Sequence, residues 1–199
     1  MTRTLVAVEF LSLDGVMQAP GDPQEDTEGG FVHGGWQRPY FDDVMGEAGA
    51  KGMAATDAYL FGRKTYQKMA AFWPTAPTDD PFAAHLNGTK KYVASRTLTD
   101  PSWPPVEVLA DDVPAAVATL KDMPGGTITV LGSGELVRSL LEHDLVDELE
   151  LTLSPLVIGS GKRLFGEATD LRRLELVGSV PTTTGCVMLR YRRARATRN

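Results

Sequence analysis

The stretch AYLFGRKTYQKM (residues 58–69) begins as an apolar strand, stops at a glycine and continues with the spacing of a helix. A second stretch, ITVLGSGELVRSLL (residues 128–141), repeats this pattern. The first N–H groups of a helix have no partner inside the helix, so each junction directs free donors outward and favours an anion. Two such junctions predict a site for a diphosphate, and a diphosphate indicates a dinucleotide.

The first junction carries basic residues where the helix begins. Gly62 is followed by Arg63, Lys64 and Thr65. Cations at a helix N-terminus oppose the helix dipole unless an anion lies nearby. This order of residues favours a phosphate beside the junction. The alternative is that both basic side chains only reach solvent.

The second junction is built from small residues, Gly132, Ser133 and Gly134. Ser133 can cap the following helix or donate its hydroxyl to a phosphate. The turn lacks the complete GxGxxG spacing of the dinucleotide fingerprint, so it is also compatible with an ordinary structural connection. Glu135 suits the positive end of a helix but repels phosphate, and we expect its side chain to point away.

Strands and helices alternate on both sides of these junctions, which favours an α/β fold with a parallel sheet. The last two expected strands are joined by a short turn, which predicts an antiparallel hairpin at the C-terminus. No repeat or linker divides the chain, so we expect one domain over residues 1–199. The expected strands are 4–13, 57–61, 90–95, 106–110, 127–131, 146–153, 174–180 and 185–193, and the expected helices are one starting near residues 39–40, 63–72, 113–123 and 135–141.

Composition narrows the functional classes. The chain has 42% hydrophobic and 23% charged residues and a formal net charge of −6, as in a soluble globular protein. The acidic excess argues against general affinity for nucleic acid. No apolar run approaches a membrane span and no signal peptide is recognised, so we expect a cytoplasmic protein. The single cysteine, Cys186, is expected to be a buried, inert thiol.

Metal chemistry and polyanion binding are not favoured by the remaining motifs. The three histidines lie far apart in the sequence, without the spacing of a zinc site, so we expect no metal. The arginine-rich end YRRARATRN (residues 191–199) is expected to be a solvated strand face and terminus, with a polyanion contact as the alternative.

Two acidic positions are candidate proton donors. Asp14 follows the first strand, and Asp42 lies at the expected start of the first helix. If either carboxyl lay in an apolar cleft beside the aromatic residues of this region, burial would raise its pKa and suit it to proton delivery. The alternatives are that Asp14 caps a turn and that Asp42 caps the helix. The neighbouring aromatic residues, our candidate substrate contacts, are Trp36, Tyr40 and Phe41.

Ser95 and Arg96 follow the expected strand 90–95. In a parallel sheet this position lies at the edge where nucleotides bind, and a guanidinium there can form a fork with a ribose 2′-phosphate. Together with Arg63, Arg96 would select NADPH over NADH by charge. The alternative is an ordinary surface arginine.

Five motifs in order resemble the dihydrofolate-reductase-like family. They are SLDG (12–15), LFGRKTY (60–66), SR (95–96), LGSGELV (131–137) and LVDELELTLSPLVIGSGKRLF (145–165). Within this family, the likeness is greatest to the reductase domain of the riboflavin-biosynthesis deaminase-reductase and its stand-alone bacterial relatives. The resemblance implies a mostly parallel central sheet flanked by helices, a C-terminal antiparallel hairpin and NADPH as cofactor.

The resemblance also implies site residues. By family position, one side of the diphosphate would be held by Gly62, Arg63, Lys64 and Thr65. The other side would be held by Gly132, Ser133, Gly134, Glu135 and Leu136. Ser95 and Arg96 would bind the 2′-phosphate, while Asp14 and residues 155–161 would border the nicotinamide and the substrate.

One departure from true folate reductases disfavours folate as substrate. Those enzymes carry a carboxylate two positions after the proline of a W-x-x-P motif, whereas here Trp36 and Pro39 are followed by Tyr40 and Phe41. The expected acid is either displaced to Asp42 or replaced. One position on a helix is a rotation of about 100°, which turns the carboxylate away. The zinc-binding HxE and PCxxC motifs of a deaminase are also absent.

We therefore expect an NADPH-dependent reductase that transfers hydride to a C=N or C=O bond of a small, pterin-like or riboflavin-precursor-like heterocycle. Asp14, Asp42 or an ordered water would supply the proton, and the long loop 18–39 would act as a wall or lid. The alternatives are a non-catalytic module that binds a nucleotide or heterocycle, and an interaction protein. We expect a homodimer.

Overall fold

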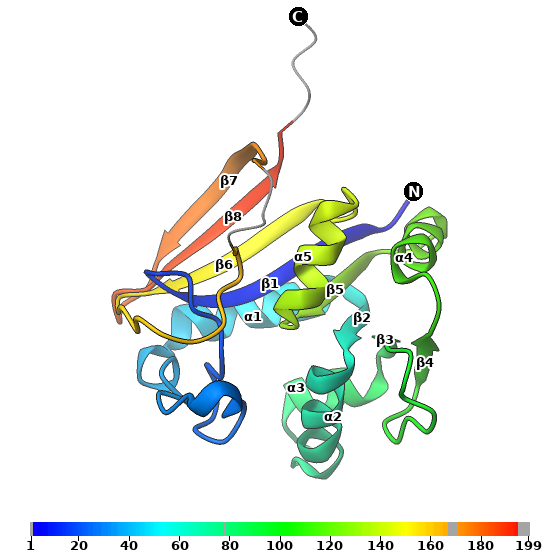
Figure 1. Cartoon of the computed structure of the whole chain (residues 1–199), viewed down its shortest axis with the longest axis horizontal. Coiled ribbons are helices and arrows are strands. Elements are labelled where there is room, and N and C mark those ends of the chain that lie inside the picture. The colour runs from blue at the N-terminus through cyan, green and yellow to red at the C-terminus, as the bar shows by residue number, and fades with distance from the viewer. Residues whose placement is uncertain (1, 78, 167–170, 195–199) are drawn as a thin grey trace, which may run out of the picture.

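The computed structural model describes residues 2–77, 79–166 and 171–194. It contains one eight-stranded sheet with helices on both faces (Figure 1). The strands are β1 (Thr4–Ser12), β2 (Thr56–Gly62), β3 (Lys90–Ala94), β4 (Val106–Leu109), β5 (Thr127–Leu131), β6 (Glu148–Ser154), β7 (Leu174–Pro181) and β8 (Val187–Arg193). The helices are α1 (Asp43–Ala55), α2 (Arg63–Phe72), α3 (Pro81–Gly88), α4 (Val113–Asp122) and α5 (Gly134–Glu142), with short 3-10 turns at Glu28–Gly30, Arg38–Tyr40 and Trp73–Thr75.

The strand order is β4-β3-β2-β5-β1-β6-β8-β7. Strands β1 to β6 pair in parallel, β8 runs antiparallel to β6, and β7 runs antiparallel to β8. The expected mostly parallel sheet and C-terminal hairpin are therefore confirmed. Because the six parallel strands share one direction, their carboxyl ends all reach the same edge of the sheet.

Successive side chains on each strand point to opposite faces of the sheet, so the core is divided between the two faces. On β2, Ala58 and Leu60 belong to the larger core under α4 and α5, whereas Tyr59 and Phe61 pack with α2 and α3 on the other face. Figure 1 shows α5 in front of the sheet and α1 behind it. Both faces of the central strands are covered, which explains their nearly continuous apolar sequences.

Two helices differ from expectation. Helix α1 begins at Asp43, not near residues 39–40, because residues 38–40 form a separate 3-10 turn and Asp42 caps the helix. Helix α3 was not expected. Its start does carry a signal: Asp80 accepts hydrogen bonds from the N–H groups of Phe82 and Ala83, and Pro81 occupies the first turn.

The C-terminal hairpin and tail agree with expectation as far as they are described. Arg190, Arg192 and Arg193 form ion pairs with Glu148, Glu175 and Asp144, respectively. Arg195 and Arg198 lie outside the described residues.

Cys186 is fully buried, as expected. Among the described helices, none has the length and apolar character needed to cross a membrane.

Candidate functional site

The sheet places the predicted cofactor residues along one edge. Ala94, Gly62 and Leu131 end the neighbouring strands β3, β2 and β5, so the segments that follow them lie in that order. The next two strands at this edge, β1 and β6, lead to Asp14 and to residues 155–161. Segments far apart in the sequence thus form a continuous rim.

The two strand–helix junctions are in direct contact. The Gly62 N–H donates to the Ser133 hydroxyl at 2.9 Å, and that hydroxyl donates to Thr65 Oγ1 at 2.6 Å. A Cβ on Gly62 would lie 2.9 Å from Ser133 Oγ, so the close approach requires glycine. The side chain of Ser133 therefore joins the start of α2 to the start of α5.

The helices at these junctions differ from the other three. Helices α1, α3 and α4 each have an aspartate whose carboxylate accepts a hydrogen bond from the first turn, namely Asp42, Asp80 and Asp112. Helices α2 and α5 have no side-chain cap among the described residues. The first N–H groups of both helices are thus without a side-chain acceptor, side by side at the same rim. This arrangement suits an anion with two phosphoryl groups.

The turn before α5 needs its glycines. Gly132 has φ of +65°, and a Cβ there would find only Thr65 Cγ2, at 3.9 Å. Gly134 is buried, and its missing Cβ leaves the space that the Met17 sulfur occupies. Leu136 is also buried, so it supports the turn from the core, while Glu135 is exposed as expected.

The basic residues of the first junction have partners. Lys64 Nζ lies 2.7 Å from Glu28 Oε2, and the same oxygen lies 2.6 Å from Lys162 Nζ. Arg63 donates to Gln67 at 3.2 Å. Hydrogen bonds from Lys162 and Lys64 lower the pKa of Glu28 to about 2. The anion beside Lys64 is therefore a carboxylate of the chain's own acidic loop.

Glu28 and Lys162 were not among the predicted site residues. Lys162 also pairs with Asp26 at 2.7 Å, and its backbone N–H donates to Gln18 Oε1. The loop 18–39 is thus tied to the segment after β6 by charges separated by more than a hundred residues in sequence. The only sequence signal was the coincidence of an acidic loop and the GSGKR motif, which does not specify a pairing.

Ser95 and Arg96 differ in exposure. Ser95 is buried, and its hydroxyl oxygen accepts hydrogen bonds from the N–H groups of Thr97 and Leu98 at 3.2 and 3.0 Å. Arg96 is exposed at the end of β3, next to the strand that ends at Gly62. Ser95 thus shapes the turn, and Arg96 is placed to meet an anion at the rim.

The surroundings of Asp14 favour its ionised form. The Ser12 hydroxyl donates to Oδ1 at 2.7 Å, the N–H groups of Ile158 and Gly159 donate at 3.0 and 2.9 Å, and Arg163 lies 3.2 Å from Oδ2. The bond from Ser12, followed by that from Ile158, holds the pKa of Asp14 far below its usual range. This carboxylate is an anchor between β1 and residues 158–163, and a poor proton donor.

Asp42 is an anchor as well. Its Oδ2 accepts hydrogen bonds from the Thr183 hydroxyl at 2.6 Å and the Thr183 N–H at 2.7 Å, while Oδ1 accepts one from Met45 N–H at 3.0 Å. The bonds from Thr183, followed by that from Met45, lower the pKa of Asp42. The acid that is displaced from a folate-type position therefore has a structural role, because it ties α1 to the turn between β7 and β8.

The three candidate aromatic residues have different environments. Trp36 is buried with Val16, Ala19 and Phe31, and its indole N–H donates to the Gln18 carbonyl at 2.7 Å. The backbone carbonyl of Tyr40 accepts a hydrogen bond from Thr184 at 2.6 Å. Phe41 is 59% exposed. Trp36 therefore stabilises the loop, and Phe41 is the aromatic side chain of the three most available to a ligand.

Comparison with known proteins identifies the family. The RibD C-terminal domain pattern matches residues 3–188. The chain belongs to the RibD C-terminal domain family. This RibD C-terminal domain is 29% identical over 138 residues to the Bacillus subtilis protein YyaP, a match that covers 68% of the chain and 73% of YyaP.

Solved structures share the fold of this RibD C-terminal domain. A Shewanella sp. PV-4 protein assigned to riboflavin biosynthesis has a TM-score of 0.70 at 20% identity, over 98% of this chain and all of the other. Dihydrofolate reductase from Enterococcus faecalis, in complex with NADP(H) and RAB-propyl, has a TM-score of 0.61 at 17% identity, over 96% and 97% of the two chains. The expected dihydrofolate-reductase-like fold is confirmed.

A third structure has two activities in one chain. It is the diaminohydroxyphosphoribosylaminopyrimidine deaminase/5-amino-6-(5-phosphoribosylamino)uracil reductase of Thermotoga maritima, with a TM-score of 0.63 at 13% identity. The match covers 97% of this chain and 57% of the Thermotoga chain. This RibD C-terminal domain thus corresponds in extent to part of that protein.

Proposed function

We propose that the protein is an NADPH-dependent reductase that transfers hydride to a C=N or C=O bond of a small heterocycle. The observation that carries this proposal is the pair of uncapped helix N-termini, α2 and α5, joined through Ser133 at the carboxyl edge of the sheet. Two comparisons support the same function. The chain belongs to the RibD C-terminal domain family, and it shares its fold with a dihydrofolate reductase that was solved with NADP(H) bound.

The residues at the rim fit the cofactor's diphosphate and ribose phosphate. Gly132 leaves open space beside Thr65, and the first N–H groups of α2 and α5 face the junction without side-chain caps. We assign the diphosphate to residues 62–65 and 132–136. Lys64 is 64% exposed, so its ammonium can exchange Glu28 for a phosphate oxygen. The Arg96 guanidinium would take the 2′-phosphate, and Ser95 would hold the turn that presents it.

When bound, NADPH supplies the hydride, and the chain supplies binding and orientation. Asp14 fixes residues 158–159 beside the end of β1 through two backbone N–H bonds. Because Asp14 and Asp42 are both held in their ionised forms, we now assign proton delivery to an ordered water and give these residues a positioning role.

Exposed apolar side chains at the carboxyl edge suit a flat heterocyclic substrate. Leu13, Phe41 and Val157 are 61%, 59% and 70% exposed, and they follow β1, precede α1 and follow β6. Such side chains can pack on an aromatic ring while backbone groups bind its heteroatoms. A pyrimidine related to riboflavin precursors is the substrate class that we favour.

We also place the protein in the cytoplasm. Its single cysteine, Cys186, is buried and forms no disulfide, which fits a reducing compartment.

Titration with NADPH and NADH, followed by protein fluorescence, tests the cofactor assignment. We expect saturable binding of NADPH and weaker binding of NADH. Oxidation of NADPH is then followed by its absorbance with a panel of pyrimidines and pterins, where turnover of at least one ring is expected. No binding of either nucleotide, or equal binding of both, would contradict the proposal.

A second candidate is a non-catalytic module that binds a nucleotide or heterocycle on the same fold. The observation that favours it is the structural use of both expected acids, Asp14 and Asp42, which leaves neither free to deliver a proton. This candidate requires NADPH binding without oxidation by any substrate in the panel. Turnover of a single compound excludes it.

We further propose that two copies associate through β7. This strand ends the sheet, and all eight of its residues are exposed. Its only charged side chain, Glu175, pairs with Arg192 at 2.7 Å. Edge strands of monomeric proteins are usually short, charged or covered, whereas β7 is long and apolar. A second copy pairing along β7 would cover it.

A further inference from the structure

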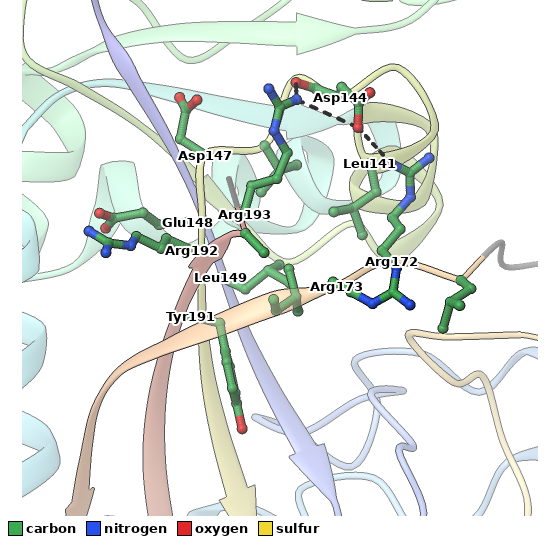
Figure 2. Close-up of a pocket in the computed structure, with 14 residues that line it drawn as sticks. Leu141, Asp144, Asp147, Glu148, Leu149, Arg172, Arg173, Tyr191, Arg192 and Arg193 are labelled. Carbon is green, nitrogen blue, oxygen red and sulfur yellow. Dashed lines mark hydrogen bonds and ion pairs between the residues drawn. The ribbon is translucent and has the colours of Figure 1, made fainter. Parts of the chain in front are cut away.

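A cavity of about 290 Å³ lies at the sheet edge opposite to the proposed reductase site. It is bordered by the end of α5, the start of β6, the end of β8 and the segment before β7. Figure 2 shows arginine side chains gathered around it from two of these segments. None of the residues assigned to the cofactor or the substrate lines this cavity.

Positive charge exceeds negative charge around this cavity. Arg172 donates to Asp144 Oδ1 at 2.7 Å, and Arg193 lies 3.6 Å from the same oxygen (Figure 2). Within the described part of the chain, the Arg173 guanidinium has no ion pair or hydrogen bond. One carboxylate therefore faces three guanidinium groups.

The other acids of the cavity wall are already paired elsewhere. Asp147 lies 2.7 Å from Lys121 and accepts the Leu5 N–H at 2.8 Å, while Glu148 pairs with Arg190. These carboxylates cannot neutralise Arg173 without losing those partners. The resulting local cationic surplus, in a chain with a net charge of −6, favours an anion from outside.

The remaining wall is apolar. Leu141, Val146 and Leu149 are buried beneath the cavity, and Leu171 and Leu174 are 87% and 38% exposed at its rim. Ligand sites combine such apolar walls with a few polar groups that fix orientation, and this volume lies near the lower end of their range, about 300 Å³. Inorganic ions alone would leave the leucines in water.

We propose that this cavity binds a small organic anion whose apolar or aromatic body lies on the leucines and whose carboxylate or phosphate meets Arg173 and Arg172. Arginine suits both head groups because its planar fork donates two parallel hydrogen bonds to their oxygens. The site is separate from the reductase site and does not depend on the proposed function.

The test is calorimetric titration of the full chain with benzoate, phenyl phosphate and inorganic phosphate, each with and without saturating NADPH. We expect saturable binding of one or both aromatic anions, with inorganic phosphate weaker than phenyl phosphate because it lacks the apolar body. The tighter of the two aromatic anions identifies the head group. NADPH should not displace either.

Two variants locate the site. Arg173→Gln should weaken binding about tenfold, because a charge-assisted hydrogen bond is lost. Arg38→Gln, in the turn before α1 and not on the cavity wall, removes an exposed guanidinium of the same kind, so it is the matched control and should bind as the wild type does. Both side chains are exposed, so folding is preserved.

Three outcomes overturn the proposal. They are absence of saturable binding by either aromatic anion, equal affinity of Arg173→Gln and wild type, and displacement by NADPH. Equal affinity for inorganic and phenyl phosphate would contradict the role of the leucines.

Discussion

Glu9 is a buried acid in the middle of β1. The residue is 3% exposed, and within the described residues its Oε1 has no hydrogen-bond partner. Burial raises the pKa of Glu9 to about 8, against a smaller opposing effect of the Arg138 charge. The carboxyl is therefore neutral in the folded protein at pH 7, although it is ionised in the unfolded chain.

This shift predicts that stability falls as pH rises. The unfolded chain releases the Glu9 proton near pH 4.5, while the folded state keeps it up to about pH 8. The contribution of Glu9 is thus fully present below pH 4.5 and is lost as pH rises through 8. At pH 7 the loss is about 3 kcal/mol, because each unit of pKa shift corresponds to about 1.4 kcal/mol.

Glu9→Gln tests this prediction, since the amide has a similar size and does not titrate. Urea unfolding at pH 5 and pH 7 should show that the wild type loses about 2.5 kcal/mol more than the variant, because part of the loss already occurs below pH 5. If both proteins have the same pH dependence, Glu9 is not neutral in the folded state.

Arg96 decides the choice between the two nicotinamide cofactors if the proposed function is right. Its exposed guanidinium would form charge-assisted hydrogen bonds with the 2′-phosphate of NADPH, which NADH lacks. Arg96→Gln should weaken NADPH binding about tenfold and leave NADH binding unchanged. Fluorescence titration measures both, and an equal loss for the two nucleotides would point to a structural role for Arg96 instead.

At the residue scale, the sequence predicted the positions of the rim residues well and their chemical roles poorly. Gly62 and Ser133 meet because β2 and β5 are adjacent parallel strands that end together, and the sequence predicted the two junctions but not the strand order. The Ser12 hydroxyl that contributes most to the low pKa of Asp14 is local, but the Ile158 and Gly159 N–H donors lie 144 and 145 positions away, and no local pattern specifies those contacts. Protonation states depend on tertiary partners, so the proton-donor hypothesis required the structure.

At the scale of elements, Asp42 links α1 to the β7–β8 hairpin. One oxygen caps the helix at Met45, and the other accepts both donors of Thr183. Asp112 makes only the equivalent cap, at Ala115 with 3.1 Å, and so provides a matched comparison. Comparing variants of the two aspartates therefore separates the stability that comes from helix capping from the stability that comes from the link to the hairpin.

We expect Asp112→Ala to lower the melting temperature by about 2 to 4 °C. Asp42→Ala should lower it further and should speed amide hydrogen exchange in the turn at residues 182–185, because the turn loses its acceptor. Differential scanning calorimetry and exchange mass spectrometry measure the two effects. Equal melting temperatures together with unchanged exchange would show that the link contributes nothing.

The bounds of elements with a strong hydrophobic pattern were predicted closely. Helices whose start is marked only by a capping residue were predicted poorly or missed. The bounds of α2 and β5 match the expected 63–72 and 127–131 because a glycine and a run of β-branched residues mark their ends. Helix α3 was missed since it has only eight residues and follows a proline-rich stretch, where Asp80–Pro81 was its sole signal.

At the scale of the molecule, the proposed dimer depends on the exposed edge strand β7. Val180 on β7 is 47% exposed, and Val32 in the loop after β1 is 82% exposed. If a second copy pairs along β7, a charge at Val180 would lie in the interface, while a charge at Val32 would remain in water. We therefore expect the wild type and Val32→Lys to be dimers by analytical ultracentrifugation, and Val180→Lys to be a monomer.

The physical reason is desolvation: an interface that covers β7 removes water from a lysine ammonium without offering a counter-charge, since Glu175 is already bound to Arg192. Because Val180 is half exposed, its replacement should leave the fold intact, which far-UV circular dichroism checks. A monomeric wild type, or a Val180→Lys variant that remains dimeric, would show that β7 is not the contact. Either result would leave the cofactor rim unaffected, because it lies at the ends of other strands.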